Sequence, residues 1–237
     1  MKPNNFMDQQ PFNMEDLSII KTSGERYNPY EFNSGTTLCV SFPKFTVIAA
    51  DTRNSSDYTI NSRTSSKIFK LRNGMSLTGT GFHGDLYEVY KILKHKQDLY
   101  LQKYETQMTV KATAHFLMNV LYGRRFFPFY TFLILTGIED NETVMYSYDP
   151  VGCYKKDIAR CYGTSQNIIQ PILDSKIYQK NNVKRDKEFT EKEVVEIIVK
   201  AFEASVERDV KSGDWLEIIV QRVNGDVESN IIELRRD

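Results

Sequence analysis

The sequence has few cysteines, no long apolar run and no excess of charge of either sign. Its 237 residues include three cysteines, Cys39, Cys153 and Cys161, an odd number without a Cys-x-x-Cys spacing. We therefore expect reduced thiols inside a cell, and not a disulfide framework. There are 31 basic and 31 acidic residues, so the formal net charge is zero. This balance argues against nucleic acid as the main partner and suits a subunit of a larger assembly.

Membrane-spanning and targeting segments are also absent from the pattern. The longest apolar runs, such as residues 129–138, are much shorter than a helix that spans a bilayer. Residues 1–34 are polar and lack the apolar core of a secretory signal. We therefore expect a protein of the cytoplasm and nucleus that does not contact a membrane.

Metal ligands and linkers are scarce as well. The three histidines, His83, His95 and His115, have no metal-ligand spacing, so we expect neither a metal nor another cofactor. No stretch rich in proline, glycine and serine divides the middle of the chain, and no repeat is evident. The sequence therefore predicts one main domain, 35–237, preceded by an extension, 1–34.

The hydrophobic pattern predicts an α/β domain in which helices cover sheets. Thr190 and Glu193 form a capping box that begins the strongest predicted helix. Asn73-Gly74 and Asn224-Gly225 are typical of tight turns between strands. Residues 180–192 are charged and predict a solvated loop, with a neighbour contact as the alternative. The expected strands are 36–42, 45–50, 67–71, 75–80, 130–137, 143–149, 154–161, 215–222 and 227–234, and the expected helices begin near 84, 109, 166 and 190.

Several short motifs occur in a fixed order along the chain. Each is weak alone, but their order and spacing are specific. They are Ser34-Gly35-Thr36-Thr37-Leu38, then Ala49-Ala50-Asp51-Thr52-Arg53, Lys67, Gly79-Thr80-Gly81-Phe82-His83-Gly84-Asp85, and finally Glu207-Arg208-Asp209-Val210-Lys211-Ser212-Gly213-Asp214.

Together these motifs resemble the proteasome β family of N-terminal nucleophile hydrolases, over about residues 26–237. The resemblance implies a four-layer αββα sandwich. It also implies a chemistry in which a threonine freed by cleavage after a glycine attacks a peptide carbonyl, with its own amine as base. By this resemblance Asp51 and Lys67 match the charged pair beside the nucleophile, and Gly81 matches the glycine that holds the oxyanion. Asp209 and Ser212 match the residues that organise the nucleophile's amine.

The nucleophile itself is missing from the expected position. In active members the aspartate and the lysine follow the threonine by 16 and 32 residues, and both Asp51 and Lys67 count back to Gly35. Thr36 comes one residue too late, and a shift of one residue turns a strand side chain to the opposite face. We therefore expect no catalytic residue, and Gly35, Asp51, Lys67, Gly81, Asp209 and Ser212 as a vestigial frame. The alternative is an active threonine endopeptidase that uses Thr36 after cleavage at Gly35.

Three stretches favour a non-catalytic branch of the family, the one at the sixth place of the β ring. They are residues 26–33, 121–130 and 146–152. The resemblance implies a structural subunit, present twice in a 28-subunit particle of α and β subunits that degrades polypeptides in ATP- and ubiquitin-dependent proteolysis. It also implies trimming of the extension near Arg26. A free-standing binding module remains a distant alternative.

Two surface features accompany this resemblance. The turn after residues 132–137 reaches the adjacent subunit's substrate cleft in this family, which makes Glu139 and Asp140 candidates for the wall of that neighbour's pocket. Arg124-Arg125 beside Phe126-Phe127 could suggest stacking on nucleic acid, but an isolated basic pair with aromatic residues is more typical of a packing or subunit contact.

Overall fold

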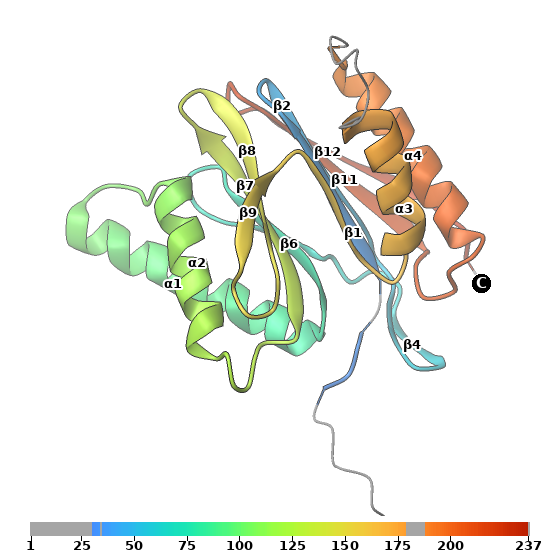
Figure 1. Cartoon of the computed structure of the whole chain (residues 1–237), viewed down its shortest axis with the longest axis horizontal. Helices are drawn as coiled ribbons and strands as arrows, with labels where there is room; N and C mark the ends of the chain where they lie inside the picture. The colour runs from blue at the N-terminus through green and yellow to red at the C-terminus, as the bar shows by residue number, and fades with distance from the viewer. Residues whose placement is uncertain (1–29, 34, 179–187, 237) are drawn as a thin grey trace, which may run out of the picture.

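The computed structural model describes residues 30–33, 35–178 and 188–236, and these residues form two packed antiparallel sheets between two pairs of helices (Figure 1). Both sheets have five strands, and every adjacent pair is antiparallel. The first sheet has the order β10 (Ala159–Gly163), β1 (Thr36–Phe42), β2 (Phe45–Asp51), β11 (Trp215–Arg222) and β12 (Val227–Glu233). The second has the order β5 (Ile68–Lys70), β6 (Ser76–Gly81), β7 (Thr131–Glu139), β8 (Glu142–Tyr148) and β9 (Tyr154–Asp157).

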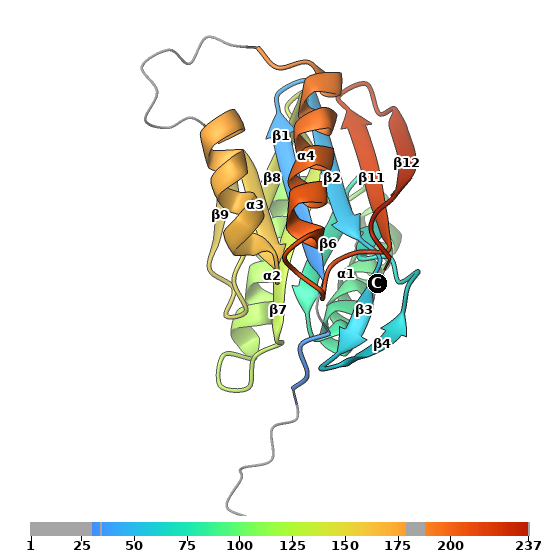
Figure 2. The same ribbon diagram turned by 90° about the vertical axis from the view of Figure 1, so that its right-hand side faces the viewer.

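Each sheet is covered on its outer face by two helices, as the two views show (Figures 1 and 2). On the first sheet lie α3 (Gln166–Leu173), which continues into a π-helical turn over Asp174–Tyr178, and α4 (Glu191–Val206). On the second lie α1 (His83–Tyr104) and α2 (Val110–Gly123). The expected four-layer αββα sandwich is confirmed.

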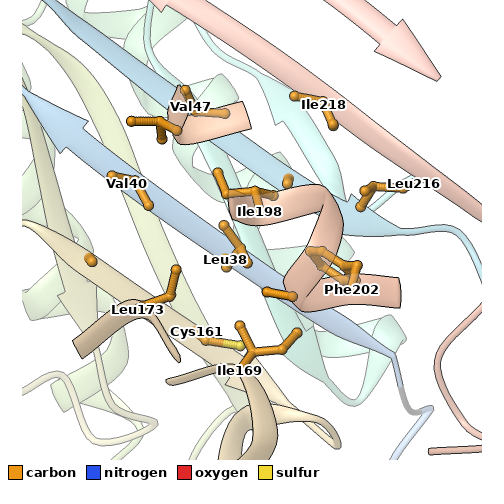
Figure 3. Packing of buried hydrophobic residues seen from close by; sticks show 14 of the residues in the cluster. Leu38, Val40, Val47, Cys161, Ile169, Leu173, Ile198, Phe202, Leu216 and Ile218 are labelled. Atoms are coloured by element: carbon orange, nitrogen blue, oxygen red, sulfur yellow. The ribbon is translucent and has the colours of Figure 1, made fainter. Parts of the chain in front are cut away.

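The central strands are apolar on both faces because each sheet has a helical layer on one side and the other sheet on the other. In Figure 3, Ile198 and Phe202 of α4 lie over Leu38 of β1 and Leu216 of β11. A separate cluster fills the space between the sheets and contains Cys39, Ile48, Ala50, Ile68, Ile134, Met145 and Ile219. Strands β1 and β2, which follow Gly35 and carry Asp51, are therefore fixed by packing from two sides.

Local signals at the element ends behave as the sequence predicts. Thr190 accepts a hydrogen bond from the Glu193 backbone N–H, and the Glu193 carboxylate accepts one from the Thr190 N–H, which completes the capping box. Strands β11 and β12 meet at the turn with Gly225 at φ +90°, a conformation that favours glycine.

The prediction of a single strand over residues 154–161 is wrong. The segment forms two strands that belong to different sheets, since Tyr154–Asp157 pairs with β8 and Ala159–Gly163 pairs with β1. The Asp157 carboxylate accepts a hydrogen bond from the Ile158 N–H and two from Arg160, so the chain turns at this point. Residues 154–162 contain no glycine, proline or asparagine that would mark the change of sheet.

A two-stranded hairpin, β3 (Asn54–Ser56) with β4 (Thr59–Ser62), was not predicted. It stands apart from both sheets in Figures 1 and 2. Its strands are short and polar and therefore lack the apolar alternation that indicates a strand.

Some predictions lie outside the described residues. These are the trimming site near Arg26, most of the 1–34 extension and most of the charged loop over 180–192. No helix in the described part of the chain is long and apolar enough to cross a membrane.

Candidate functional site

Gly35 lies against the Lys67 ammonium at the start of β1, as the sequence spacing predicts. A Cβ placed on Gly35 would lie 2.4 Å from Lys67 Cε, 2.6 Å from Lys67 Nζ and 2.8 Å from Asp51 Oδ1. Gly35 is also at φ +87°, where residues with a side chain are strained. The backbone and the surroundings of this position therefore both favour glycine.

The buried lysine beside Gly35 has an acceptor for each of its three protons. Lys67 Nζ donates to Asp51 Oδ1 at 3.0 Å, to the Asp51 carbonyl at 2.8 Å and to the Arg53 carbonyl at 2.8 Å. Sequence reasoning predicted the carboxylate partner, whereas the two carbonyl acceptors follow from the extended path of the chain after β2.

Asp51 is fully buried, and its carboxylate accepts hydrogen bonds from three groups. Besides Lys67, the Thr36 N–H donates to Oδ1 at 2.7 Å and the Gly213 N–H donates to Oδ2 at 3.2 Å. Burial raises the pKa of Asp51 above its ordinary value, while Lys67 and the backbone donors act in the opposite direction. Asp51 thus links β1, β2 and the loop before β11 around one carboxylate.

The Thr36 hydroxyl belongs to a different set of contacts from Gly35. It lies 2.8 Å from Ser212 Oγ and accepts a hydrogen bond from the Ser165 N–H at 3.1 Å. The contacts of its hydroxyl are therefore with the loop before β11 and the start of α3. The predicted register places the Thr36 side chain on the side opposite to that of Gly35, because successive residues of a strand face opposite sides.

Asp209 gathers hydroxyl groups at the end of α4. Its Oδ2 accepts hydrogen bonds from Thr164 at 2.5 Å, Ser165 at 2.6 Å and Ser212 at 2.9 Å. Burial alone would raise the pKa of Asp209, but these hydroxyl donors and a backbone N–H lower it below its ordinary value. Thr36, through Ser212, is one hydrogen bond removed from this carboxylate.

Thr164 and Ser165 are site residues that sequence reasoning missed. They lie between β10 and α3, where Gly163 has φ +121° and its Cα is so close to Gly35 that an added Cβ would be 2.1 Å from the Gly35 carbonyl oxygen. The signal was Gly163-Thr164-Ser165, a glycine followed by two hydroxyl residues at the start of a helix.

Gly81 ends β6 beside the segment that precedes Gly35. It has φ +121°, and its carbonyl accepts a hydrogen bond from the Asn33 N–H at 3.0 Å. The Asn33 carbonyl accepts from the Ser55 N–H at 3.3 Å, and its side-chain Oδ1 accepts from the His83 N–H at 2.8 Å. Asn33 thus connects the segment before β1 to β6, β3 and α1.

A small cavity remains beside this segment. Its volume is about 10 Å³, room for roughly one water molecule. It is lined by Lys67 and by the buried Thr80, whose hydroxyl has no partner among the described residues, together with Asn33, Asn54, Gly79, Gly81, His83 and Leu86.

The structure places Glu139 and Asp140 far from this frame. They lie at the turn between β7 and β8, eight residues beyond Thr131, which pairs with Gly81, a distance of about 26 Å along the strand. Asp140 and Asn141 have φ 51° and 61°, typical of a two-residue hairpin turn. Glu139 accepts a hydrogen bond from the Tyr146 hydroxyl, which together with burial raises the pKa of Tyr146 to about 12.

The three histidines are dispersed, and the described residues contain no group of carboxylates, histidines and cysteines that could hold a metal ion. His83 begins α1, where burial and the nearby Lys67 lower its pKa. His115 Nδ1 lies 3.2 Å from the Tyr154 hydroxyl.

The geometry thus retains a buried cation beside the start of β1 and a separate hydroxyl–carboxylate cluster. Among the described residues Lys67 donates to a carboxylate and to two carbonyls and to no hydroxyl group. Position 35 has no side chain, and the Thr36 hydroxyl contacts Ser212 and the Ser165 N–H. A nucleophilic mechanism needs the hydroxyl and its activating group within hydrogen-bond reach.

Comparison with known proteins gives the same family as the motifs. A family model described as "Proteasome subunit" matches residues 31–221. A "Probable proteasome subunit beta type-6" of Encephalitozoon cuniculi is 42% identical over 90% of this chain and 72% of its own length. The chain belongs to the proteasome β-subunit family. The "Proteasome subunit beta type-1" of Danio rerio is 38% identical over 90% of both chains, and the "Proteasome subunit beta type-6" of Saccharomyces cerevisiae is 34% identical over 90% of this chain and 92% of its own.

Membership in the proteasome β-subunit family confirms the resemblance inferred from the motifs. The family match extends from residue 31 to residue 221, so it includes Gly35, Asp51, Lys67 and Gly81, as well as Asp209 and Ser212. These six positions are therefore part of the shared fold and not of an added segment.

Proposed function

We propose that this chain is a non-catalytic structural β subunit of the 20S proteasome core particle. The observation that carries the proposal is the contact between Gly35 and Lys67: the activating cation is present, and the residue beside it has no hydroxyl. Loss of the nucleophile from such a catalytic unit costs on the order of 10⁶ in rate.

In this role the chain occupies one position of the β ring and supports proteolysis by its neighbours. The particle contains 28 α and β subunits, of which two are copies of this chain, and polypeptides are degraded there in ATP- and ubiquitin-dependent proteolysis. We place it in the cytoplasm and nucleus. The relatives of types 1 and 6 support this assignment to one ring position.

The frame then has a structural role. Asp51, Lys67 and Asp209, with their hydrogen bonds, join β1 to β2, to the start of α3 and to the loop before β11. We propose that they keep this end of the domain in its native arrangement and that no step of peptide hydrolysis takes place on them.

The alternative of a threonine endopeptidase with Thr36 as nucleophile is less well supported. Its hydroxyl contacts Ser212 and the Ser165 N–H, and its nitrogen donates to Asp51. Cleavage after Gly35 would have to move Thr36 by one strand position to bring its hydroxyl to Lys67.

The test is to treat the purified particle with an epoxyketone or β-lactone probe and to sequence the N-terminus of this chain. We expect catalytic subunits of the same particle to be labelled, this chain to remain unlabelled, and its first residue to precede Gly35. Probe attached to Thr36, together with Thr36 as the first residue, would overturn the proposal.

A further inference from the structure

The loop between α2 and β7 exposes two adjacent phenylalanines to solvent. Phe126 is 96% exposed and Phe127 is 60% exposed. Figures 1 and 2 show this loop extending beyond the end of α2, on the same side of the molecule as the segment that leads into β1. Adjacent phenylalanines in water are unfavourable, and such exposure is typical of an interaction site.

Hydrogen bonds within the loop fix its conformation, so the exposed rings have defined positions. The Arg124 N–H bonds to the Leu121 carbonyl, the Arg125 N–H to the Tyr122 carbonyl and the Phe127 N–H to the Arg124 carbonyl, each at 3.0–3.1 Å. The Tyr30 hydroxyl donates to the Pro128 carbonyl at 2.7 Å, and its ring lies 5.4 Å from that of Phe127. Such preorganisation reduces the entropy lost on binding.

Two arginines, Arg124 and Arg125, flank the exposed rings. Arg125 lies 5.7 Å from the ring centres of Tyr122 and Phe126, and Arg124 lies 4.4 Å from that of Phe129. Within the described part of the chain neither guanidinium forms an ion pair. Their forks of N–H donors are suited to carboxylates.

We propose that Phe126 with Arg124 and Arg125 docks into an apolar pocket edged by carboxylates on an adjacent, different proteasome subunit. This rests on the proposed place of the chain in the ring. A ring of different subunits is built from heterologous contacts, in which a projection on one chain meets a recess on another. Aromatic and arginine residues are the types that contribute most to such contacts.

A second copy of this chain fits the same loop less well. A symmetric contact would bring two pairs of arginines together, and no carboxylate of the loop would neutralise them, since residues 121–130 contain no acidic residue. Nucleic acid is also disfavoured, because the chain has no net charge to support a phosphate-binding surface.

The decisive experiment replaces Phe126 with p-benzoyl-L-phenylalanine in cells and irradiates the purified particle. Mass spectrometry of that particle first establishes that the chain has been incorporated. We expect a crosslink to a peptide of one other subunit, with aspartate or glutamate close to the linked residue. A particle that contains the chain but gives no crosslink, or only a crosslink to this chain or its second copy, overturns the docking proposal and leaves the proposed structural role in place.

Charge reversal provides the second measurement. Arg124→Glu/Arg125→Glu should lower the share of the chain found in full particles by about tenfold or more, because opposed charges at a buried contact become like charges. Lys94→Glu/Lys96→Glu is the control, since it makes the same change in charge on α1, where each lysine also lies over an aromatic ring. Equal losses in the two variants would overturn the specific role of the loop.

Discussion

Gly35 and Lys67 share a single space: the lysine's terminal carbon and nitrogen occupy the region into which a side chain at position 35 would extend. Lys67 cannot readily withdraw, because its ammonium donates to Asp51 twice and to Arg53 once inside a buried site. Glycine at this position is therefore a steric requirement of the folded chain, and it leaves no hydroxyl group at position 35.

Gly35→Ala should destabilise the chain by about 2–4 kcal/mol, because a left-handed backbone and an overpacked site act together. Gly225→Ala is a matched control, since Gly225 has φ +90° and no atom within 4 Å of an added Cβ. It should cost only about 1–2 kcal/mol, the backbone contribution alone. The measurement is the urea concentration at which each variant leaves the purified particle. Equal shifts for both variants would contradict a clash at Lys67.

The network around Lys67 should behave as a coupled unit. Lys67→Met leaves Asp51 buried without its counter-charge and should destabilise by about 3–5 kcal/mol. The double variant with Asp51→Asn should cost less than the sum of the two single changes, because neither unpaired charge remains. Urea dissociation of the four particles gives this cycle directly. Additive effects would mean that the two residues do not stabilise one another.

Much of this arrangement could be predicted from the sequence where it depends on spacing along one strand. Asp51 and Lys67 count back to the same residue, and strand periodicity then determines the face on which Gly35 and Thr36 lie. Turns and caps were equally accessible, because Asn-Gly pairs and the Thr190–Glu193 box depend on local chemistry.

Features that depend on contacts between distant segments could not be predicted in this way. The separation of β9 from β10 is decided by pairing with β8 and β1, and no signal in the pattern near Ile158 reveals it. The roles of Thr164 and Ser165 arise because β10 pairs with β1 and brings them to Asp209. Polar residues carry no periodic signal, and so the hairpin β3–β4 was also missed.

Asp214 gives a test that depends on pH. It is fully buried, pairs with Arg53 at 2.8 Å and also binds Arg63. Burial alone would raise the pKa of Asp214, but hydrogen bonds from the two arginines lower it below its ordinary value of 3.8. A carboxyl group whose pKa is lowered by folding stabilises the fold above its unfolded pKa, and this contribution is lost as the pH falls through the folded value.

Asp214→Asn should therefore destabilise by about 3–5 kcal/mol at neutral pH, because Arg53 stays buried without a charge partner. The difference from the unmodified chain should stay constant between about pH 5 and 8 and shrink below about pH 4. Urea titrations across this range measure it. Asp98→Asn is the control, since Asp98 pairs with Arg72 at the surface and should contribute less than about 1 kcal/mol. A pH-independent difference down to pH 3 would contradict the lowered pKa.

The last prediction concerns the turn between β7 and β8, where Glu139 and Asp140 are proposed to line the substrate pocket of the subunit in the fifth, chymotrypsin-like position. Asparagine is the appropriate replacement for Asp140, because its φ of 51° would strain alanine and confound the loss of charge with a change of backbone. In Glu139→Gln/Asp140→Asn particles, we expect cleavage of peptides with a basic residue near the scissile bond to fall relative to acidic ones by roughly two- to fivefold, since an exposed charge pair contributes up to about 1 kcal/mol. Fluorogenic peptides specific for the other catalytic sites should be cleaved as before. Asp226→Asn, in the turn between β11 and β12, makes a similar change at another exposed hairpin and should leave all sites unaffected. If the ratio of kcat/KM for basic and acidic peptides at the chymotrypsin-like site is the same in all three particles, the turn has no part in the neighbour's pocket and Glu139 serves only as the acceptor for Tyr146.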